Sequence, residues 1–238
     1  MWHRPRAVTA FVINVIVVLI LAAPLVAEAA EHFQAASGKR DDPAAMLRLL
    51  APLAAQGSAE AQLALGFMYS EGYGVTQDHA EAVKWFQLSA GQGNARAQAA
   101  LGAAYASGRG VRQDPSEAAK WRRRAADQGD AIAQAALGAA YSQGYGVPRD
   151  HAEAVKWYRR AADQGNVHGH AMLGYAYAHG FGVPQDVVLA YMWFDLAAAG
   201  GHKNASRAKD DIAQQMARAH IAQARKLARE WRPMKERH

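Results

Sequence analysis

Pairs of acidic residues recur along the chain and are the first candidates for chemistry. In each pair an aspartate precedes a glutamate by three residues: Asp78 with Glu81, Asp114 with Glu117, and Asp150 with Glu153. Two carboxylates on one helical turn could act as general acid and base. The same spacing is also that of a capping box, in which both residues bind the free N–H groups of a helix start. Because the pair returns wherever a helix must begin, we interpret these acids as structural.

Other catalytic and metal-binding patterns are weak. Ser206 and Lys209 match the SxxK nucleophile pattern of penicillin-recognising enzymes, but the sequence has no SDN or KTG companion, no GxSxG and no HExxH. His168 and His170 are two residues apart and diverge on a helix, whereas His79 and His151 belong to non-adjacent repeats. Cysteine is absent, which excludes thiol nucleophiles and thiolate ligands. The sequence therefore predicts a non-enzymatic protein with no catalytic residue, metal or cofactor.

An eleven-residue segment organises the chain. LGFMYSEGYGV, at Leu65 to Val75, returns every thirty-six residues as LGAAYASGRGV, LGAAYSQGYGV and LGYAYAHGFGV. A tryptophan follows ten residues after each Val, and a glycine eight residues later. A period of this length indicates a solenoid of helical pairs, in which each unit buries its apolar face against its neighbours. The predicted repeats are 58–93, 94–129, 130–165 and 166–201.

Each repeat contains the signals of two helices. The first helix follows a residue that favours the N-cap: Ser58, Asn94, Asp130 or Asn166. Ala61, Leu65 and Tyr69 then share one core-facing side, and Gly66 permits close approach of a neighbouring helix. The GxGV segment ends the first helix, because its glycines can adopt left-handed conformations. The second helix begins at the recurring aspartate, and its tryptophan is predicted to be a packing residue.

The array has incomplete repeats at both ends. Asp42 to Gly57 matches a second helix with Leu49 in the tryptophan position, so 30–57 is predicted to be a half repeat. Beyond the fourth repeat, 202–238 is predicted to hold two capping helices, at 204–215 and 221–231, and a basic tail. Such caps cover the apolar edge of a solenoid.

These motifs resemble those of the Sel-one-like repeat, or SLR, family of the tetratricopeptide superfamily. The resemblance covers Asp42 to Gly201 and rests on four copies of LGxxYxxGxGV followed by Asp, Ala, Trp, Ala-Ala and Gly. It implies an all-α fold, an α/α superhelix, used as an adaptor or scaffold for protein complexes. Exported bacterial members act in signalling, envelope regulation and host interaction. Some cysteine-rich secreted relatives are described as weak β-lactamases, but this chain lacks their cysteines.

The start of the chain has the pattern of an export signal. Arg4 and Arg6 precede an apolar run from Ala7 to Ala23, and Ala27-Glu28-Ala29 places small residues at a cleavage site. We expect cleavage of 1–29 after Ala29 and a periplasmic or secreted protein. The alternative is an uncleaved anchor in the inner membrane with the repeats facing the periplasm, since Ala7 to Ala27 is nearly long enough to span a bilayer.

Basic charge is concentrated at the C-terminal end. Glu31 to His202 has a net charge of −1, with 15 Lys or Arg against 16 Asp or Glu, whereas Lys203 to His238 has +6, with 10 against 4. We interpret the tail as a solvated cap, with an anionic binding patch as the alternative. Nucleic acid is not expected for an exported protein. Membrane contact is expected only through an uncleaved signal or through anionic lipid at the tail.

The second helices carry further arginines and lysines, which we interpret as a solvated face. They are Lys120, Arg122, Arg123 and Arg124 in one repeat and Lys156, Arg159 and Arg160 in the next. Their stems can cover apolar surface, and Asp127 and Asp163 are near enough in the chain to pair with them.

Binding is predicted on the concave side of the superhelix, which first helices line in the superfamily. The predicted residues are Glu60, Leu63, Phe67, Glu71, Arg96, Ala99, Ala103, Ser107, Ile132, Ala135, Ala139, Gln143, His168, Ala171, Tyr175 and His179. Phe67 and Tyr175 are the expected anchors for a protein or peptide bound by a monomer. The alternatives are alanines that only tighten the superhelix, an envelope enzyme acting on a β-lactam or cell-wall fragment, and a membrane-surface protein.

Overall fold

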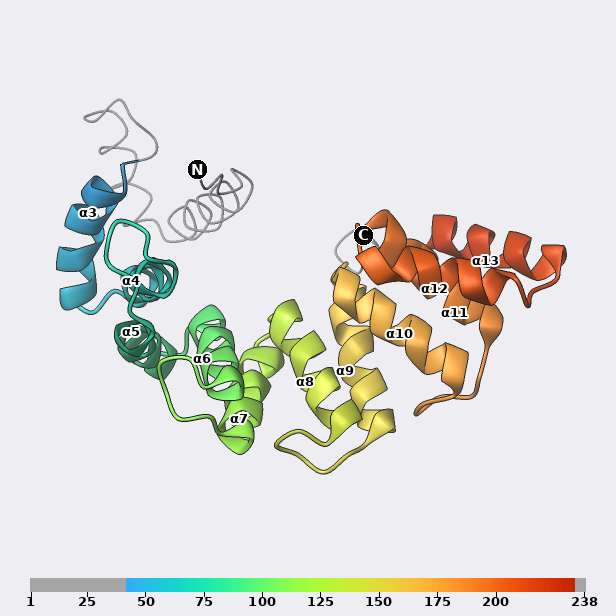
Figure 1. Cartoon of the computed structure of the whole chain (residues 1–238), viewed down its shortest axis with the longest axis horizontal. Coiled ribbons are helices and arrows are strands. Elements are labelled where there is room, and N and C mark those ends of the chain that lie inside the picture. The colour runs from blue at the N-terminus through green and yellow to red at the C-terminus, as the bar shows by residue number, and fades with distance from the viewer. Residues whose placement is uncertain (1–41, 234–238) are drawn as a thin grey trace, which may run out of the picture. The chain divides into compact units, whose positions relative to one another are not determined.

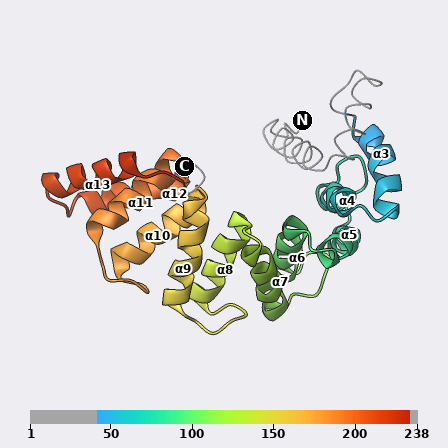
Figure 2. The ribbon, with the colours of Figure 1, turned by 180° about the vertical axis from the view of Figure 1, so that it is seen from behind.

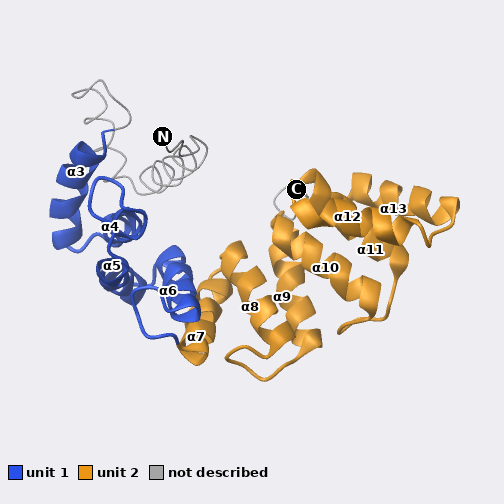
Figure 3. Cartoon of the chain, in the orientation of Figure 1, with its two compact units in different colours: residues 1–113 blue, residues 114–238 orange. Residues whose placement is uncertain are grey.

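The computed structural model describes residues 42–233, and this part of the chain consists of α-helices joined by short turns (Figures 1 and 2). The predicted all-α solenoid of helical pairs is confirmed. The predicted signal segment, 1–29, lies outside the described residues. The chain divides into two compact units, 1–113 and 114–238 (Figure 3). Each unit is described by itself.

The first unit contains the half repeat, the first full repeat and the first helix of the second. Its helices are α3 Pro43–Ala55, α4 Ala59–Glu71, α5 His79–Gly91 and α6 Ala95–Ser107. The helix α3 lies in the segment where the sequence predicts the second helix of the half repeat. Leu50, Ala61, Leu65 and Met68 form the core of this unit, with Trp85 packed against it.

The second unit contains the remaining repeats and the C-terminal cap. Its helices are α7 Pro115–Asp127, α8 Ala131–Gln143, α9 His151–Asp163, α10 Val167–His179, α11 Val187–Ala199, α12 Lys203–Ala213 and α13 Arg218–Glu230. The final helix begins three residues before the predicted start at Ile221. Leu173, Tyr191 and Trp193 are core residues, against which Ile221 and Leu227 of α13 pack.

The first helices begin as their sequence predicts. Ser58, Asn94, Asp130 and Asn166 have extended backbones, and each side chain accepts a hydrogen bond from the N–H three residues later.

The aspartates at the second-helix starts are structural, but they form only half of a capping box. Asp150 accepts from the N–H of Glu153 at 2.9 Å. Its own N–H donates to the carbonyl of Tyr141 at 2.9 Å, so the glutamate side chain has no role as its acceptor. Glu153 instead pairs with Lys156 at 3.0 Å, and the same pairing joins Glu81 to Lys84 and Glu117 to Lys120.

Glycines permit close approaches both within and between repeats. Gly66 of α4 packs against the ring of Phe86 on α5, and Gly138 and Gly174 pack in the same way against Tyr158 and Phe194. In the GxG turn of the third repeat, Gly144 and Gly146 have φ of 72° and 75°. A Cβ on Gly146 would fall on the carbonyl of Pro115, which begins the preceding second helix. The turn therefore fixes one repeat against the previous one.

Buried glutamines link neighbouring helices. Gln134 donates to the carbonyl of Ala126 at 3.1 Å and accepts from Gln164 at 2.8 Å. Gln62 makes the equivalent bonds to Ala54 at 3.1 Å and from Gln92 at 2.7 Å. These bonds satisfy polar groups that burial would otherwise leave unpaired.

Candidate functional site

Three of the sixteen predicted binding residues cannot line an open surface, which corrects the sequence interpretation. Leu63, Ala135 and Ala171 are 1%, 3% and 0% exposed. The reason is visible in α4, where every residue from Ala61 to Gly66 is buried. Because neighbouring helices pack on several sides of a first helix, fewer of its residues are accessible to solvent than the sequence pattern predicts.

The other thirteen residues keep accessible surface. Eight are exposed: Glu71, Arg96, Ala103, Ser107, Ile132, Gln143, His168 and His179. Five are half-buried: Glu60, Phe67, Ala99, Ala139 and Tyr175. Some of these residues come together in two hollows, one within each unit.

The first hollow, here called the Phe67 hollow, lies between α4, α5 and α6 and has a volume of about 160 Å³. Phe67 meets Phe86 edge to face, with ring centroids 5.2 Å apart and an interplanar angle of 69°. Ala103 and Ser107 of α6 line the opposite wall, and Arg109 contributes a guanidinium. The hollow thus has an aromatic wall and a small-residue wall.

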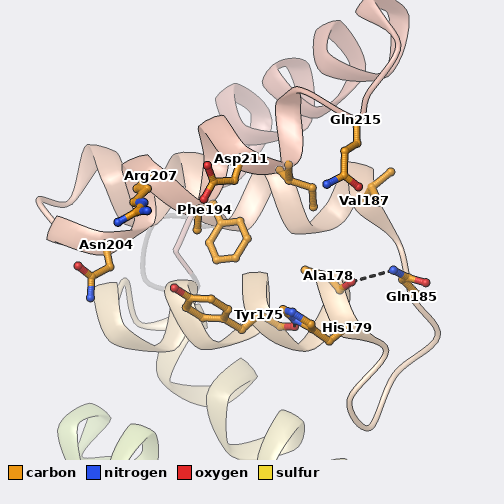
Figure 4. A pocket seen from close by; sticks show the side chains of 12 residues that line it. Tyr175, Ala178, His179, Gln185, Val187, Phe194, Asn204, Arg207, Asp211 and Gln215 are labelled. Carbon is orange, nitrogen blue, oxygen red and sulfur yellow. Dashed lines mark hydrogen bonds between the residues drawn. The ribbon is translucent and has the colours of Figure 1, made fainter.

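The second hollow, here called the Tyr175 hollow, lies between α10, α11 and α12 (Figure 4) and has a volume of about 670 Å³. Tyr175 meets Phe194 edge to face, with centroids 5.0 Å apart and an angle of 80°. The ring of His179 stacks near that of Tyr175 at 6.3 Å, and its Nδ1 lies 3.0 Å from the Tyr175 carbonyl. This volume is typical of ligand sites, and the edge-to-face pair forms its apolar floor.

The two hollows occupy the same place in the repeat. Their lining residues match after three periods of thirty-six residues: Phe67 with Tyr175, Phe86 with Phe194, Ala103 with Asp211, and Ser107 with Gln215. The intervening repeats carry Ala103 and Ala139 at the aromatic position. The two residues that the sequence predicts as aromatic anchors, Phe67 and Tyr175, therefore each line a hollow.

The wall that α12 supplies to the Tyr175 hollow was missed by sequence reasoning. Asn204, Arg207 and Asp211 of α12 line it, and Gln215 joins them from the turn after the helix. Among the described residues no ion pair joins Arg207 to Asp211 or to another carboxylate. The thirty-six-residue register was the signal that could have found this wall, since Asp211 and Gln215 continue the Ala103 and Ser107 positions.

An aromatic stack extends from the Tyr175 hollow. Phe181, in the GxG turn, is 49% exposed and lies between His179 and His151, with centroid distances of 5.3 and 5.1 Å. The stack adds apolar surface next to the hollow.

The arginines of the second helices are held by aromatic rings. Arg123 donates to the hydroxyl of Tyr141 and lies 5.0 Å from the ring of Trp157. Arg159 repeats the arrangement with Tyr177 and Trp193. These contacts assign Arg123 and Arg159 a packing role, in addition to the solvated one that the sequence predicted.

Ser206 and Lys209, which match the SxxK pattern, do not have the surroundings of a catalytic pair. Ser206 is exposed, and Lys209 pairs with Asp195 at 3.0 Å, which raises the pKa of the lysine. A general base requires a lowered lysine pKa, so this environment is opposite to the requirement. Within residues 42–233 no group of three potential ligands could hold a metal ion, and none of the described helices is long and apolar enough to cross a bilayer.

Comparison with known proteins connects this arrangement to a family. The Sel1 repeat model matches residues 59–94, 95–130, 131–166 and 167–202. The chain belongs to the Sel1 repeat family. Its four matched Sel1 repeats contain the helical pairs described above, and the family's SLR fold is the all-helical solenoid observed.

Two solved structures share the fold. A Sel1 repeat protein from Oxalobacter formigenes is 31% identical, with a TM-score of 0.70, over 88% of this chain and 91% of that protein. The protective antigen c5321 of uropathogenic Escherichia coli, which displays an SLR fold, is 27% identical with a TM-score of 0.56. That similarity covers 84% of this chain but only 51% of the antigen, so the chain spans about half of its length. The comparison with curated proteins gives no match.

Proposed function

We propose that this Sel1 repeat protein is a non-enzymatic adaptor that binds a protein or peptide partner through its first-helix surface. The observation that carries the proposal is the recurrence of one aromatic-floored hollow in the same register of the repeat, at Phe67 and at Tyr175. Aromatic side chains in partly desolvated hollows are the usual anchors of protein interfaces. Helices on three sides preform each hollow, which lowers the ordering cost of binding.

We further propose that the protein acts outside the cytoplasm, in envelope signalling or regulation. The basic, apolar and small-residue segments of 1–29 support export with cleavage after Ala29. Mass spectrometry of the protein recovered from the periplasm should give a chain that begins at Ala30. A full-length chain recovered with the membrane would instead support the uncleaved anchor.

Affinity capture from an envelope extract tests the adaptor function. The bait is the purified protein, compared with a triple variant, Phe67→Ala, Ala103→Arg and Tyr175→Ala, which removes both anchors and fills the smaller hollow. Circular dichroism first establishes that the variant remains helical. We expect a partner retained by the parent and weakened at least about tenfold by the variant, since two anchors are lost.

Leu88→Ala is the matched control, because Leu88 is an exposed apolar residue, at 53%, that lines neither hollow. The control should retain the partner. Equal retention by the triple variant would place binding elsewhere on the protein and refute the proposal.

A further inference from the structure

Polar and charged side chains of α12 and of the turn after it form one wall of the Tyr175 hollow. Asn204, Arg207 and Asp211 follow one another at intervals of three or four residues, so they share one face of α12 (Figure 4). Gln215 lines the hollow from the turn that follows the helix. Two carboxamides therefore flank a guanidinium and a carboxylate. Phe194 and Tyr175 supply the apolar floor below them.

The charged pair of this wall is available to a ligand. Both Arg207 and Asp211 are exposed, and no ion pair of either residue occurs within the described part of the chain. A ligand that reaches both groups must carry a negative charge beside Arg207 and a positive charge beside Asp211. Because the two groups line the same hollow with opposite charges, complementary charges on a ligand contribute to the specificity of binding there.

The carboxamides favour an extended peptide over a helix. A side-chain amide offers both a donor and an acceptor, as a peptide backbone does. A helical ligand already pairs its own backbone groups, whereas an extended segment presents them to its surroundings. Asn204 and Gln215 are exposed. Asn204 precedes the charged pair on α12, and Gln215 follows it in the turn after the helix, so an extended backbone passing Arg207 and Asp211 can reach both.

The distance between Arg207 and Asp211 determines how far apart the complementary charges must lie on the peptide. Four residues along α12 correspond to a rise of about 6 Å from Arg207 to Asp211. In an extended segment, side chains two residues apart lie on the same side and are separated by about 6.6 Å. The residue between them points to the other side, toward the aromatic floor.

We propose that the Tyr175 hollow binds an extended peptide segment with an acidic residue, an apolar residue and a basic residue in succession. The acid pairs with Arg207, the base pairs with Asp211, and the apolar side chain rests on Tyr175 and Phe194. The proposal rests on the adaptor function and specifies its partner. Either chain direction satisfies the geometry, so the order base, apolar, acid belongs to the same class.

Selection from a random dodecapeptide phage library on the immobilised protein tests this inference. We expect enrichment of peptides in which an acid and a base flank one apolar residue, two positions apart. Enrichment of opposite charges three or four positions apart would indicate a helical ligand and overturn the proposal. A selection without any enriched pattern would overturn it as well.

Charge-reversal variants provide the second arm, with labelled peptides that contain Glu-Phe-Lys, Glu-Phe-Glu or Lys-Phe-Lys cores. Asp211→Lys should weaken Glu-Phe-Lys binding by about tenfold and favour Glu-Phe-Glu, whereas Arg207→Glu should favour Lys-Phe-Lys. Asp210→Lys is the matched control, because it changes the net charge equally on a neighbouring exposed residue that does not line the hollow. It should keep the parent preference.

The outcomes separate this inference from the adaptor function. Peptides that bind the parent and lose affinity in Tyr175→Ala, but do not respond to Arg207→Glu or Asp211→Lys, would refute the charge pattern and leave the adaptor function standing. Equal effects of Asp210→Lys and Asp211→Lys would also refute it, because the response would then reflect net charge alone.

Discussion

The imidazole of His170 lies edge-on to the indole of Trp231, with ring centroids 4.8 Å apart and an interplanar angle of 89°. The histidine is 4% exposed and occupies the register of Gln62 and Gln134. Its Nε2 donates to the Ala162 carbonyl at 3.2 Å, as the glutamines do one or more repeats earlier. Gly200 replaces the glutamine that would donate to it, and His170 Nδ1 has no partner among the described residues. Burial without a partner for Nδ1 therefore disfavours the charged form of His170.

Stability is predicted to fall as the pH decreases below about 6.5, the ordinary pKa of histidine. Burial is the main cause that lowers the pKa of His170, and the hydrogen bond to Ala162 and the charge of Asp163 oppose it. The unfolded chain then binds a proton that the folded chain does not, so acidification favours unfolding. His168 contributes in the same direction but less, because it is exposed: partial desolvation of its ring and the neighbouring His202 lower its pKa.

His170→Gln should reduce this acid sensitivity, because glutamine keeps the bond to Ala162 without titrating. The measurement is the urea unfolding midpoint at about pH 7.5 and about pH 5.5, with exposed His220→Gln as control. If the variant and its control lose equal stability on acidification, His170 has no part in the effect.

Gly146→Ala is predicted to destabilise the second unit by about 2–4 kcal/mol. The position has φ of 75°, and an added Cβ would collide with the backbone of Pro115. Gly129→Ala is the control, because Gly129 has φ of 91° but no atom within 4 Å of the added Cβ. Chemical denaturation should show a loss of only about 1 kcal/mol for the control. Similar losses in both variants would mean that only backbone conformation matters at Gly146.

Arg123→Lys is predicted to cost about 1 kcal/mol although the charge is unchanged. Lysine lacks the planar guanidinium that lies 5.5 Å from the ring of Tyr141 and 5.0 Å from that of Trp157. It also loses the bond to the Tyr141 hydroxyl. Thermal unfolding of this variant should be compared with that of Arg149→Lys, an exposed arginine in a turn. A melting temperature equal to that of the parent would contradict the packing role.

Tyr158 is predicted to make the protein sensitive to base. Burial against Gly138 raises the pKa of Tyr158 to about 12, partly offset by a hydrogen bond with Ser142. A tyrosine that stays protonated in the folded state stabilises that state fully below about pH 10, and this contribution is lost as the pH rises from about 10 to about 12. Between about pH 9 and about pH 11, Tyr158→Phe should lose less stability than the parent. Equal losses would exclude Tyr158 as the cause.

The helical pairs and their limits could be derived from the sequence alone. Ser58, Asp78 and the GxG glycines act through bonds and backbone angles within a few residues of their own position. Those local signals recur every thirty-six residues, and this period predicted α3 and α12 as continuations of the array. Phe67 and Tyr175 could be singled out for the same reason, since they are the aromatic residues at a register position where the intervening repeats carry Ala103 and Ala139.

Only the tertiary structure decided which parts of each helix remain accessible and what faces them. Leu63, Ala135 and Ala171 share the predicted surface pattern but are covered, because neighbouring helices bury more of a first helix than its own periodicity indicates. The pairing of Arg123 with Tyr141 and the wall that Arg207 and Asp211 add to the Tyr175 hollow join different helices. Their positions depend on how those helices pack, which no local sequence signal specifies.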